Sequence, residues 1–353
     1  MPVRVVEGVD EIALLAEGTE GSPGAYAGLP TRLPFWLIHS LRYLHPDAAT
    51  RSVFVTSDDG KLRGLAPLVE TPGGRGPLEL AGSAIHDEPS DVFWADDDAL
   101  TELCEGVARL GVPVVLDRLP VGSPTVDRLR GSLGLRGRMF VRASNPTPWV
   151  EIDPEDPLGH MSSRRRQDLR RARRRAEALG GFSSEVAAPR PGEVDALLDL
   201  ALDIEAASWK GAKGTAVAFD ELRAPFYRAV ARSAAEKGLL RIAIGRIGGD
   251  PCAMQVALHA GDSFWLLKIG YDEQFSRCSP GQLMMEDSIR WAADAGVLAY
   301  EFLGTVESWT AMWTSLERSY VRLLLFPWTF SGARALAEKV LKKVGRSATG
   351  AGS

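Results

Sequence analysis

The stretch from Phe264 to Gly296 limits the possible folds of this chain more than any other segment. Phe264 to Tyr271 is short, apolar and aromatic, which predicts a buried strand. Ser279-Pro280-Gly281-Gln282 then has the composition of a helix start, with serine at the N-cap, proline at the first helical position and glutamine completing an S-x-x-Q capping box. Apolar residues spaced three and four apart follow. The sequence therefore predicts a strand, a loop and an amphipathic helix that ends at Gly296.

The start of this helix also has the features of a phosphate site. Gly281, at the second helical position, leaves the backbone bare for a ligand. The free amide groups and the helix dipole favour an anion there, and Arg277 adds a charged donor just upstream. The same residues suit an ordinary capped helix, so both interpretations stay open.

Composition excludes several classes of protein. A length of 353 residues favours two domains, and 45% apolar with 25% charged residues is typical of a soluble globular protein. The net charge of −5 argues against a nucleic-acid binder by bulk charge. The three cysteines are far apart, which favours reduced thiols, and the five histidines lack metal-ligand spacing. With no signal peptide or spanning run in the sequence, we expect a cytoplasmic protein without a metal.

Residues 144–160 are rich in proline and aspartate, which indicates a domain junction. Ahead of it, the pattern predicts a helix at 34–44, strands at 52–56 and 62–69 joined by a hairpin turn around 58–61, and a helix at 100–110 followed by a buried strand. We expect three parts: an N-terminal domain at 1–155, a C-terminal domain at 156–330 and an amphipathic tail at 331–353. The basic tail suits docking on its own domain or a peripheral membrane contact.

A basic helix is predicted at residues 162–179. Eight arginines lie between Arg164 and Arg175, beside a narrow apolar stripe, and a glycine pair ends the helix. One interpretation is a solvated helix packed through that stripe. The other is a docking site for a polyanion such as phosphate, an acidic glycan or RNA. Charge alone does not choose between them.

Residues 182–326 predict the order strand, two helices, a three-strand meander, helix, strand, a helix at 308–316 and a last strand. Glu205 falls on the apolar face of the first of these helices. Charged groups are seldom buried without a partner. Glu205 is therefore a candidate for a site in a cleft, and equally for a structural ion pair.

This order is that of the GNAT acyltransferase fold, and the sequence resembles the CelD-like family of GNAT acyltransferases, which is itself similar to the Fem-type aminoacyltransferases. The segments that carry the resemblance are GLAPLVE, RRRQDLRRARRRAEALGG, EAASWKG, FYRAVA, YDEQFSRCSPGQLM and YEFLGTVESWTAMW. It implies an α/β (α+β) fold with two tandem GNAT-like domains, each a mixed, mostly antiparallel sheet flanked by helices. The donor site would lie in the C-terminal domain, because the corresponding N-terminal helix opens with Asp96-Asp97-Asp98, whose charges repel a pyrophosphate.

The sequence departs from the family pattern in two places. GNAT proteins usually carry Q/R-x-x-G-x-G/A at the phosphate turn, whereas Arg277 to Leu283 keeps one glycine. The family's D-F-L-x-G, followed by Y-K, is replaced by Glu301-Phe302-Leu303 and then Trp309-Thr310. These changes bear on donor affinity and acceptor choice.

The resemblance implies N-acyl transfer from an acyl-CoA to an amine acceptor: a sugar amine, a cell-envelope or polysaccharide precursor, or a small metabolite. The amine must lose a proton, for which the candidate bases are Glu205, Glu301 and Asp272. Tyr271 or Tyr227 would protonate the leaving thiolate. The residues expected at the donor phosphates are Arg277, Ser279, Gly281, Gln282 and Leu283, and those expected at the acceptor are Trp209, Lys210, Tyr227, Lys268 and Trp309.

Two alternatives remain open at this stage. An aminoacyl-tRNA-dependent Fem-like transferase would hold tRNA on the helix from Arg164 to Arg175, and its binding would weaken steeply with salt. A non-catalytic GNAT-like scaffold has no turnover to lose, so replacing Glu205 and Glu301 by glutamine would change nothing.

Overall fold

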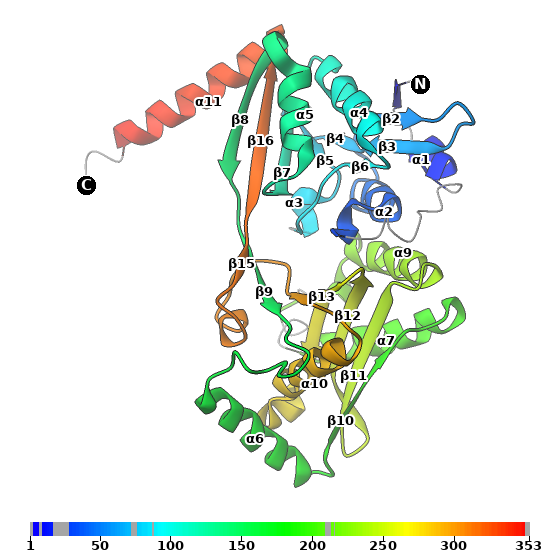
Figure 1. Ribbon diagram of the computed structural model, residues 1–353, viewed down its shortest axis with the longest axis vertical. Helices are drawn as coiled ribbons and strands as arrows, with labels where there is room; N and C mark the ends of the chain where they lie inside the picture. The colour runs from blue at the N-terminus through cyan, green and yellow to red at the C-terminus, as the bar shows by residue number, and fades with distance from the viewer. Residues whose placement is uncertain are drawn as a thin grey trace. The chain divides into compact units, whose positions relative to one another are not determined.

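The structure is a computed structural model that describes residues 3–6, 9–16, 28–71, 76–86, 88–208, 213–214 and 216–349 (Figure 1). The chain divides into two compact units. Unit 1 contains Thr31–Asn145 and the segment that begins at Ser319, and unit 2 contains Pro146–Arg318. The units therefore differ from the expected domains at residues 146–155 and 319–330. The reason is strand pairing: β9 (Thr147–Glu151) pairs with β14 (Ala299–Glu301) of unit 2, and β16 (Tyr320–Pro327) pairs with strands of unit 1.

Unit 2 is built on a mixed sheet that counts seven strands among the described residues. From one edge to the other, the strands are β10 (Phe182–Ala187), β11 (Leu240–Ile247), β12 (Asp250–Ala260), β13 (Ser263–Tyr271), β14, β9 and β15 (Glu317–Arg318). The predicted meander, β11 to β13, is antiparallel. β13 and β14 run parallel and pair only from Ser263 to Trp265.

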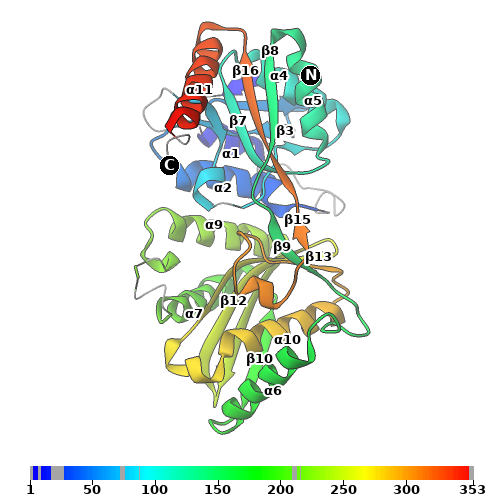
Figure 2. The ribbon, with the colours of Figure 1, turned by 90° about the vertical axis from the view of Figure 1, so that its left-hand side faces the viewer.

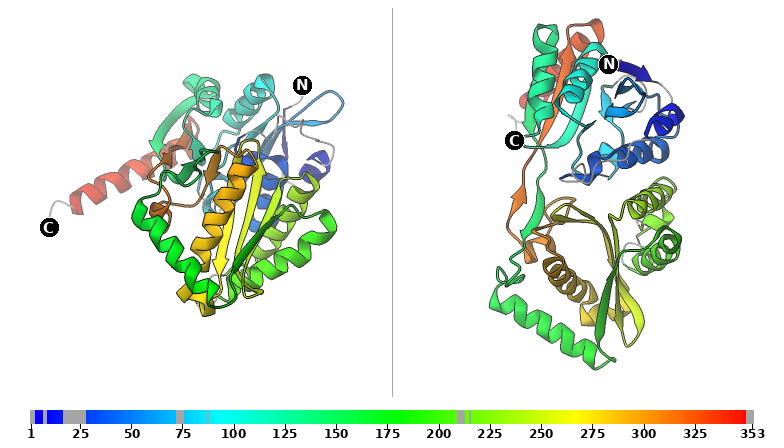
Figure 3. Two further views of the ribbon diagram at one scale, coloured as in Figure 1. Left: turned by 60° about the horizontal axis from the view of Figure 1, so that its bottom comes forward. Right: turned by 45° about the vertical axis from the view of Figure 1, so that its right-hand side comes forward.

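Helices cover both faces of this sheet (Figure 3). α7 (Val194–Ala206) and α9 (Arg223–Glu236) lie on one face. α10 (Pro280–Asp294) lies across the other, with the arginine helix α6 (Ser163–Glu177) beside it (Figure 2). α10 buries Met285, Ile289 and Ala292 in the core, as its apolar spacing predicts. The helix expected at 308–316 is wrong, because only Thr310–Met312 is helical there, as the 3-10 turn η7.

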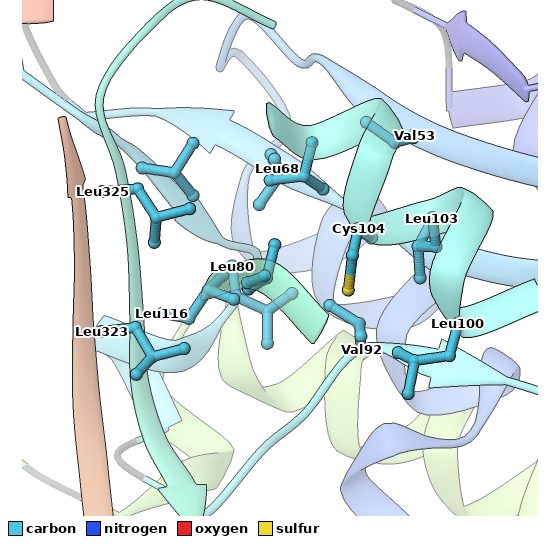
Figure 4. Packing of buried hydrophobic residues seen from close by; sticks show 14 of the residues in the cluster. Val53, Leu68, Leu80, Val92, Leu100, Leu103, Cys104, Leu116, Leu323 and Leu325 are labelled. Carbon is cyan, nitrogen blue, oxygen red and sulfur yellow. The ribbon is translucent and has the colours of Figure 1, made fainter. Parts of the chain in front are cut away.

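Unit 1 contains two sheets in the part of the chain that the structure describes. One is ordered β1 (Val3–Val6), β2 (Ser52–Thr56), β3 (Leu62–Ala66) and β6 (Phe93–Trp94); the other is ordered β4 (Leu68–Glu70), β5 (Leu78–Leu80), β7 (Val114–Pro120), β16 and β8 (Gly137–Ala143). The strand expected at 62–69 is divided at Pro67, a residue that cannot donate to a strand ladder. Side chains of both sheets, such as Val53 and Leu116, meet in one core (Figure 4).

The helices of unit 1 are α1 (Val9–Ala16), α2 (Pro34–Leu44), α3 (Ser83–His86), α4 (Asp97–Arg109), α5 (Pro124–Leu133) and α11 (Phe330–Thr349). Asp96 caps α4 by accepting from the amide of Ala99 at 3.0 Å, as an acidic helix start predicts. α11 packs on β16 through Ala335 and Leu336. None of the helices in the described ranges combines the length and apolarity needed to cross a bilayer. Mixed sheets flanked by helices confirm the predicted fold class.

β13 lies very close to α7 at Gly270, which makes the packing of the sheet against this helix testable. A Cβ at Gly270 would lie 2.9 Å from Cα of Glu205, so the strand can rest on the helix only without a side chain there. We expect Gly270→Ala to lower the free energy of unfolding of unit 2 by about 1–3 kcal/mol through overpacking. Urea unfolding measures this change. The control is Gly192→Ala, which meets nothing within 4 Å and should be near neutral; equal effects in both variants would contradict the packing.

Candidate active site

The helix start that the sequence singled out has a different geometry from the one expected. Ser279 has φ 52° and ψ 51°, and its side chain makes no capping hydrogen bond. The predicted capping box is therefore wrong, because a capping serine needs extended backbone, whereas Ser279 also ends the 3-10 helix η6 (Glu273–Cys278) in a left-handed conformation. Its carbonyl instead accepts from the amides of Gln282 and Leu283 at 3.0 and 3.2 Å.

One amide remains available at this helix start. Pro280 has no N–H, and the amide of Gly281 has no hydrogen-bond partner among the described residues. A Cβ at Gly281 would lie 3.3 Å from Cδ1 of Tyr271, so glycine keeps the approach open beside that ring. Leu283, by contrast, is fully buried in the core and its amide is occupied, which leaves it no group for a donor.

A cavity of about 560 Å³ joins this helix start to the arginine helix. Its polar wall consists of Ser279 and Gln282 of the α10 start and, from the side of α6, Ser162, Arg164, Arg165, Asp168, Arg171 and Arg175. Met312 and Trp313 line the cavity from the segment after β14. Residues more than a hundred positions apart in the sequence therefore face one space, with four arginines and one carboxylate on one side and the start of α10 on the other.

The arginines of α6 fall into two groups. Arg173 pairs with Glu286 and Asp287 of α10, at 3.2 and 2.6 Å, and this pairing holds the two helices together. Arg175 donates through Nε to the carbonyl of Arg277. Nη1 of Arg165 is buried and has no partner among the residues described. An unpaired guanidinium nitrogen in a cavity is suited to an anionic ligand.

A second set of candidates follows the face of β13 that carries α7 and α9. Glu205 lies against Gly270, and the ammonium of Lys268 lies 4.5 Å from the ring centroid of Tyr227. Trp265 is the register partner of Glu301 on β14. Four predicted site residues therefore lie on or beside β13, namely Glu205, Tyr227, Lys268 and Glu301.

Glu205 is buried, with 1% of its surface exposed, and its Oε2 accepts the amide of Val217 at 3.0 Å. This contact ties α7 to the 3-10 helix η5 (Val217–Phe219). This buried hydrogen bond gives the carboxylate a structural contact, and a catalytic role for Glu205 stays a prediction.

Glu301 is buried at the junction of β13, β14 and β9. Its Oε1 accepts Nε and Nη2 of Arg318 at 3.0 and 2.8 Å, while Oε2 has no partner among the described residues. The guanidinium of Arg318 stacks on Trp149, 3.5 Å from the ring centroid. Burial raises the pKa of Glu301; the hydrogen bonds and charge of Arg318 lower it in part, and the charge of Asp262 adds to the rise.

The remaining predicted residues are placed as follows. Burial raises the pKa of Tyr271, and Glu273 adds to the rise. Asp272 accepts from the amide and the side chain of Gln274 at 2.9 and 2.7 Å, which caps η6. Trp309 packs edge-on against Phe302 in the core on the α10 face, away from Lys268. Trp209 and Lys210 lie outside the described residues.

Sequence reasoning missed Arg318, Trp149 and Trp265. The two partners of Glu301 come from β15 and β9, which flank it only through long-range pairing. A tryptophan within the predicted strand was a usable signal, since an indole N–H needs a partner when buried. Within the described ranges, no group of three or more His, Cys, Asp or Glu side chains is placed to hold a metal ion.

Residues 163–310 match a family model described as an acetyltransferase (GNAT) domain. This match confirms the predicted GNAT domain over that range. Assignment to the CelD-like family stays a prediction. No curated protein matches the sequence.

Three solved structures have a similar fold. A domain from Agrobacterium fabrum assigned to a lysylphosphatidylglycerol synthetase superposes with a TM-score of 0.58 at 11% identity, covering 94% of this chain and 95% of that one. FemX superposes with a TM-score of 0.54 at 12% identity, covering 93% and 97%. A conserved protein of unknown function from Bacteroides thetaiotaomicron gives 0.53 at 11%, covering 92% and 99%. At these identities the likeness shows the fold alone.

The environment of Glu301 predicts a pH dependence of stability. Folding holds its pKa above the usual 4.5, so the stability linked to this group is present below that pH and is lost as pH rises. We expect the free energy of unfolding of the wild type to fall relative to that of Glu301→Gln as pH increases from 4.5. Urea titrations at a series of pH values measure this slope. The exposed control Glu221→Gln should show no such divergence, and parallel curves for Glu301→Gln would contradict the account.

Proposed function

We propose that unit 2 is an acyltransferase that moves an acyl group from an acyl-CoA to an amine acceptor. The observation that carries the proposal is the cavity in which the α6 arginines and the start of α10 meet. A GNAT family match over 163–310 supports the reaction class. The acyl-CoA donor, the cytoplasmic location that such a donor implies and the identity of the acceptor are parts of this proposal.

The distance along β13 between Tyr271 and Trp265 suits the extended shape of an acyl-CoA. Tyr271 lies beside Gly281 at the phosphate end, and Trp265 lies beside Glu301 where β14 separates from β13. Six residue steps of strand span about 20 Å. Acyl-CoA carries its phosphates and its acyl group at opposite ends of an extended arm, so one molecule would reach both places along the strand.

The chemistry then uses groups already on this face. The amine nitrogen attacks the thioester carbon, the carbon–sulfur bond breaks, and the amide product forms as the thiolate leaves. Oε2 of Glu301 takes a proton from the acceptor, because a base is needed at the nitrogen. A backbone N–H of β13 stabilises the oxyanion. Tyr227, beside Lys268, lies nearer to Glu301 along the strand than Tyr271 does and is the better placed donor to sulfur.

A thermal-shift titration with acetyl-CoA, longer acyl-CoAs and free CoA tests the donor. Binding to the folded state alone adds about 2.7 kcal/mol at a hundredfold excess over the dissociation constant, which is readily detected. Gly281→Glu should abolish the shift, since a carboxylate repels the phosphates and blocks the helix start. Arg165→Ala should weaken binding at least tenfold, from the loss of about 1.5–3 kcal/mol in a charged hydrogen bond.

Arg170→Ala is the matched control, because Arg170 lies on the same helix but does not line the cavity. It should bind CoA as the wild type does. No shift with any CoA compound would overturn the acyl-CoA proposal. A shift followed by turnover that survives both Glu205→Gln and Glu301→Gln would remove these carboxylates from the chemistry, and a scaffold would show no turnover in any variant.

One observation favours a second candidate, an aminoacyl-tRNA-dependent transferase. The basic surface of α6 extends past the cavity: six arginines have no carboxylate partner among the described residues, namely Arg164, Arg165, Arg166, Arg170, Arg174 and Arg175. A longer polyanion such as tRNA would contact all of them.

Charged tRNA binding measured against salt concentration distinguishes the two donors. If tRNA is the donor, the logarithm of the binding constant falls by about 0.7–0.9 per phosphate contact for each logarithmic unit of salt, and Arg170→Ala reduces that slope. An acyl-CoA enzyme would bind tRNA weakly and would treat Arg170→Ala as neutral.

A further inference from the structure

Two buried polar atoms of unit 2 lie on neighbouring strands without partners among the described residues. Oε2 of Glu301 is one, in a residue that is 2% exposed, and Nε1 of Trp265 is the other, in a residue that is 6% exposed. The two residues are register partners in the parallel pairing of β13 and β14, so their side chains project from the same face of the sheet. A hydrogen-bond acceptor and a donor are therefore adjacent, and neither is satisfied by the protein.

Arg318 determines which oxygen of Glu301 is available. Its Nε and Nη2 both bond to Oε1, at 3.0 and 2.8 Å, and its guanidinium stacks on Trp149 of β9. Trp149 is the register partner of Glu301 on the other side. A planar guanidinium held by a ring and by two hydrogen bonds has a fixed orientation. The carboxylate is therefore fixed with Oε1 occupied and Oε2 open.

The position of this pair connects it to the proposed reaction. Trp265 and Glu301 are the last paired residues before β13 and β14 separate. In the acyl-transfer proposal, this is the end of the strand where the acyl group arrives. A partner for the two atoms at this point would therefore be the acceptor rather than the donor.

We propose that Oε2 of Glu301 and Nε1 of Trp265 together bind the acceptor, and that Arg318 is the positioning residue for Glu301; this inference rests on the proposed acyl transfer. The ligand must donate an N–H to Oε2 and accept a hydrogen bond from Nε1. The acceptor class is accordingly a primary amine that also carries a hydroxyl group, as in an amino alcohol or an amino sugar.

The proton balance follows from this arrangement. The ammonium form of the acceptor binds the carboxylate and transfers one proton to Oε2. The free amine attacks the thioester carbon and forms the amide bond as the carbon–sulfur bond breaks. Tyr227 protonates the departing sulfur to give the free thiol and takes up the second proton that the nitrogen releases. Glu301 then returns its proton to solvent.

Nuclear magnetic resonance of the full chain labelled with 15N-tryptophan tests the pair directly. The Trp265 indole signal is identified by its loss in Trp265→Phe, or by its contacts to β14 should that variant fail to fold. We expect 2-aminoethanol to shift this signal downfield and to bind at least tenfold more tightly than ethylamine, which satisfies Oε2 only, and than ethylene glycol, which lacks the charged ammonium group. Glu301→Gln should lose the preference for 2-aminoethanol. The exposed neighbour Glu317→Gln is the control and should behave as the wild type.

The pH dependence of 2-aminoethanol binding tests the role of Arg318. Binding requires the carboxylate, so it is lost as pH falls through the pKa of Glu301. The charged groups that act on Glu301 are Arg318 from β15 and Asp262 from the turn before β13, while Trp149 and Trp265 flank it. Arg318→Met removes the influence that lowers this pKa, and the binding midpoint should move to higher pH. A purely structural arginine would change affinity without moving the midpoint.

Two outcomes overturn the proposal: a Trp265 indole signal that 2-aminoethanol does not shift, and equal binding of ethylamine and 2-aminoethanol. Either result leaves the CoA titration untouched, because donor binding at α10 is measured without an acceptor. Conversely, a CoA titration without any thermal shift would rule out acyl-CoA as the donor. The Trp265 indole signal would still report whether a ligand binds at Glu301 and Trp265.

Discussion

The early separation of β13 from β14 is the constraint on which the rest of unit 2 depends. The two strands pair over three residues, from Ser263 to Trp265, and β13 then continues to Tyr271 with β12 as its strand partner. β14 pairs with β9 along its other edge over the same three residues and ends at Glu301. This separation places Glu301 at one end of the strand and the start of α10 at the other, so a donor and an acceptor would approach the same strand from different sides.

The arginine helix combines structural contacts with the proposed anion site, and its composition alone could not separate the two. Leu169, Ala172 and Ala176 bury its narrow apolar stripe, and Arg173 fastens it to α10 through Glu286 and Asp287. These contacts are structural. They also fix Arg164, Arg165, Arg171 and Arg175 at the wall of the cavity, and Nη1 of Arg165 has no partner among the described residues. Positioning of the helix and its capacity for an anion therefore follow from the same docking.

Local sequence patterns predicted most helices and strands, but they could not predict which distant strands pair. The meander, α6 and α10 follow from apolar spacing and glycine-containing turns, which act within one segment. The capping box failed because a left-handed Ser279, set by the preceding 3-10 helix, outweighed a favourable side-chain pattern. β9 was missed because its partner β14 lies far along the chain, and a stretch rich in proline and aspartate gave no strand signal. Glu301 was predicted as a site residue, whereas the orientation given by Arg318 required the folded sheet.

A crystal structure of the full chain with CoA bound tests the proposed donor site most directly. We expect pyrophosphate oxygens within hydrogen-bond distance of the Gly281 amide and of Arg165, with the pantetheine arm along β13 and its sulfur toward Glu301. CoA density at any other surface, with the cavity between α6 and α10 empty, would contradict it.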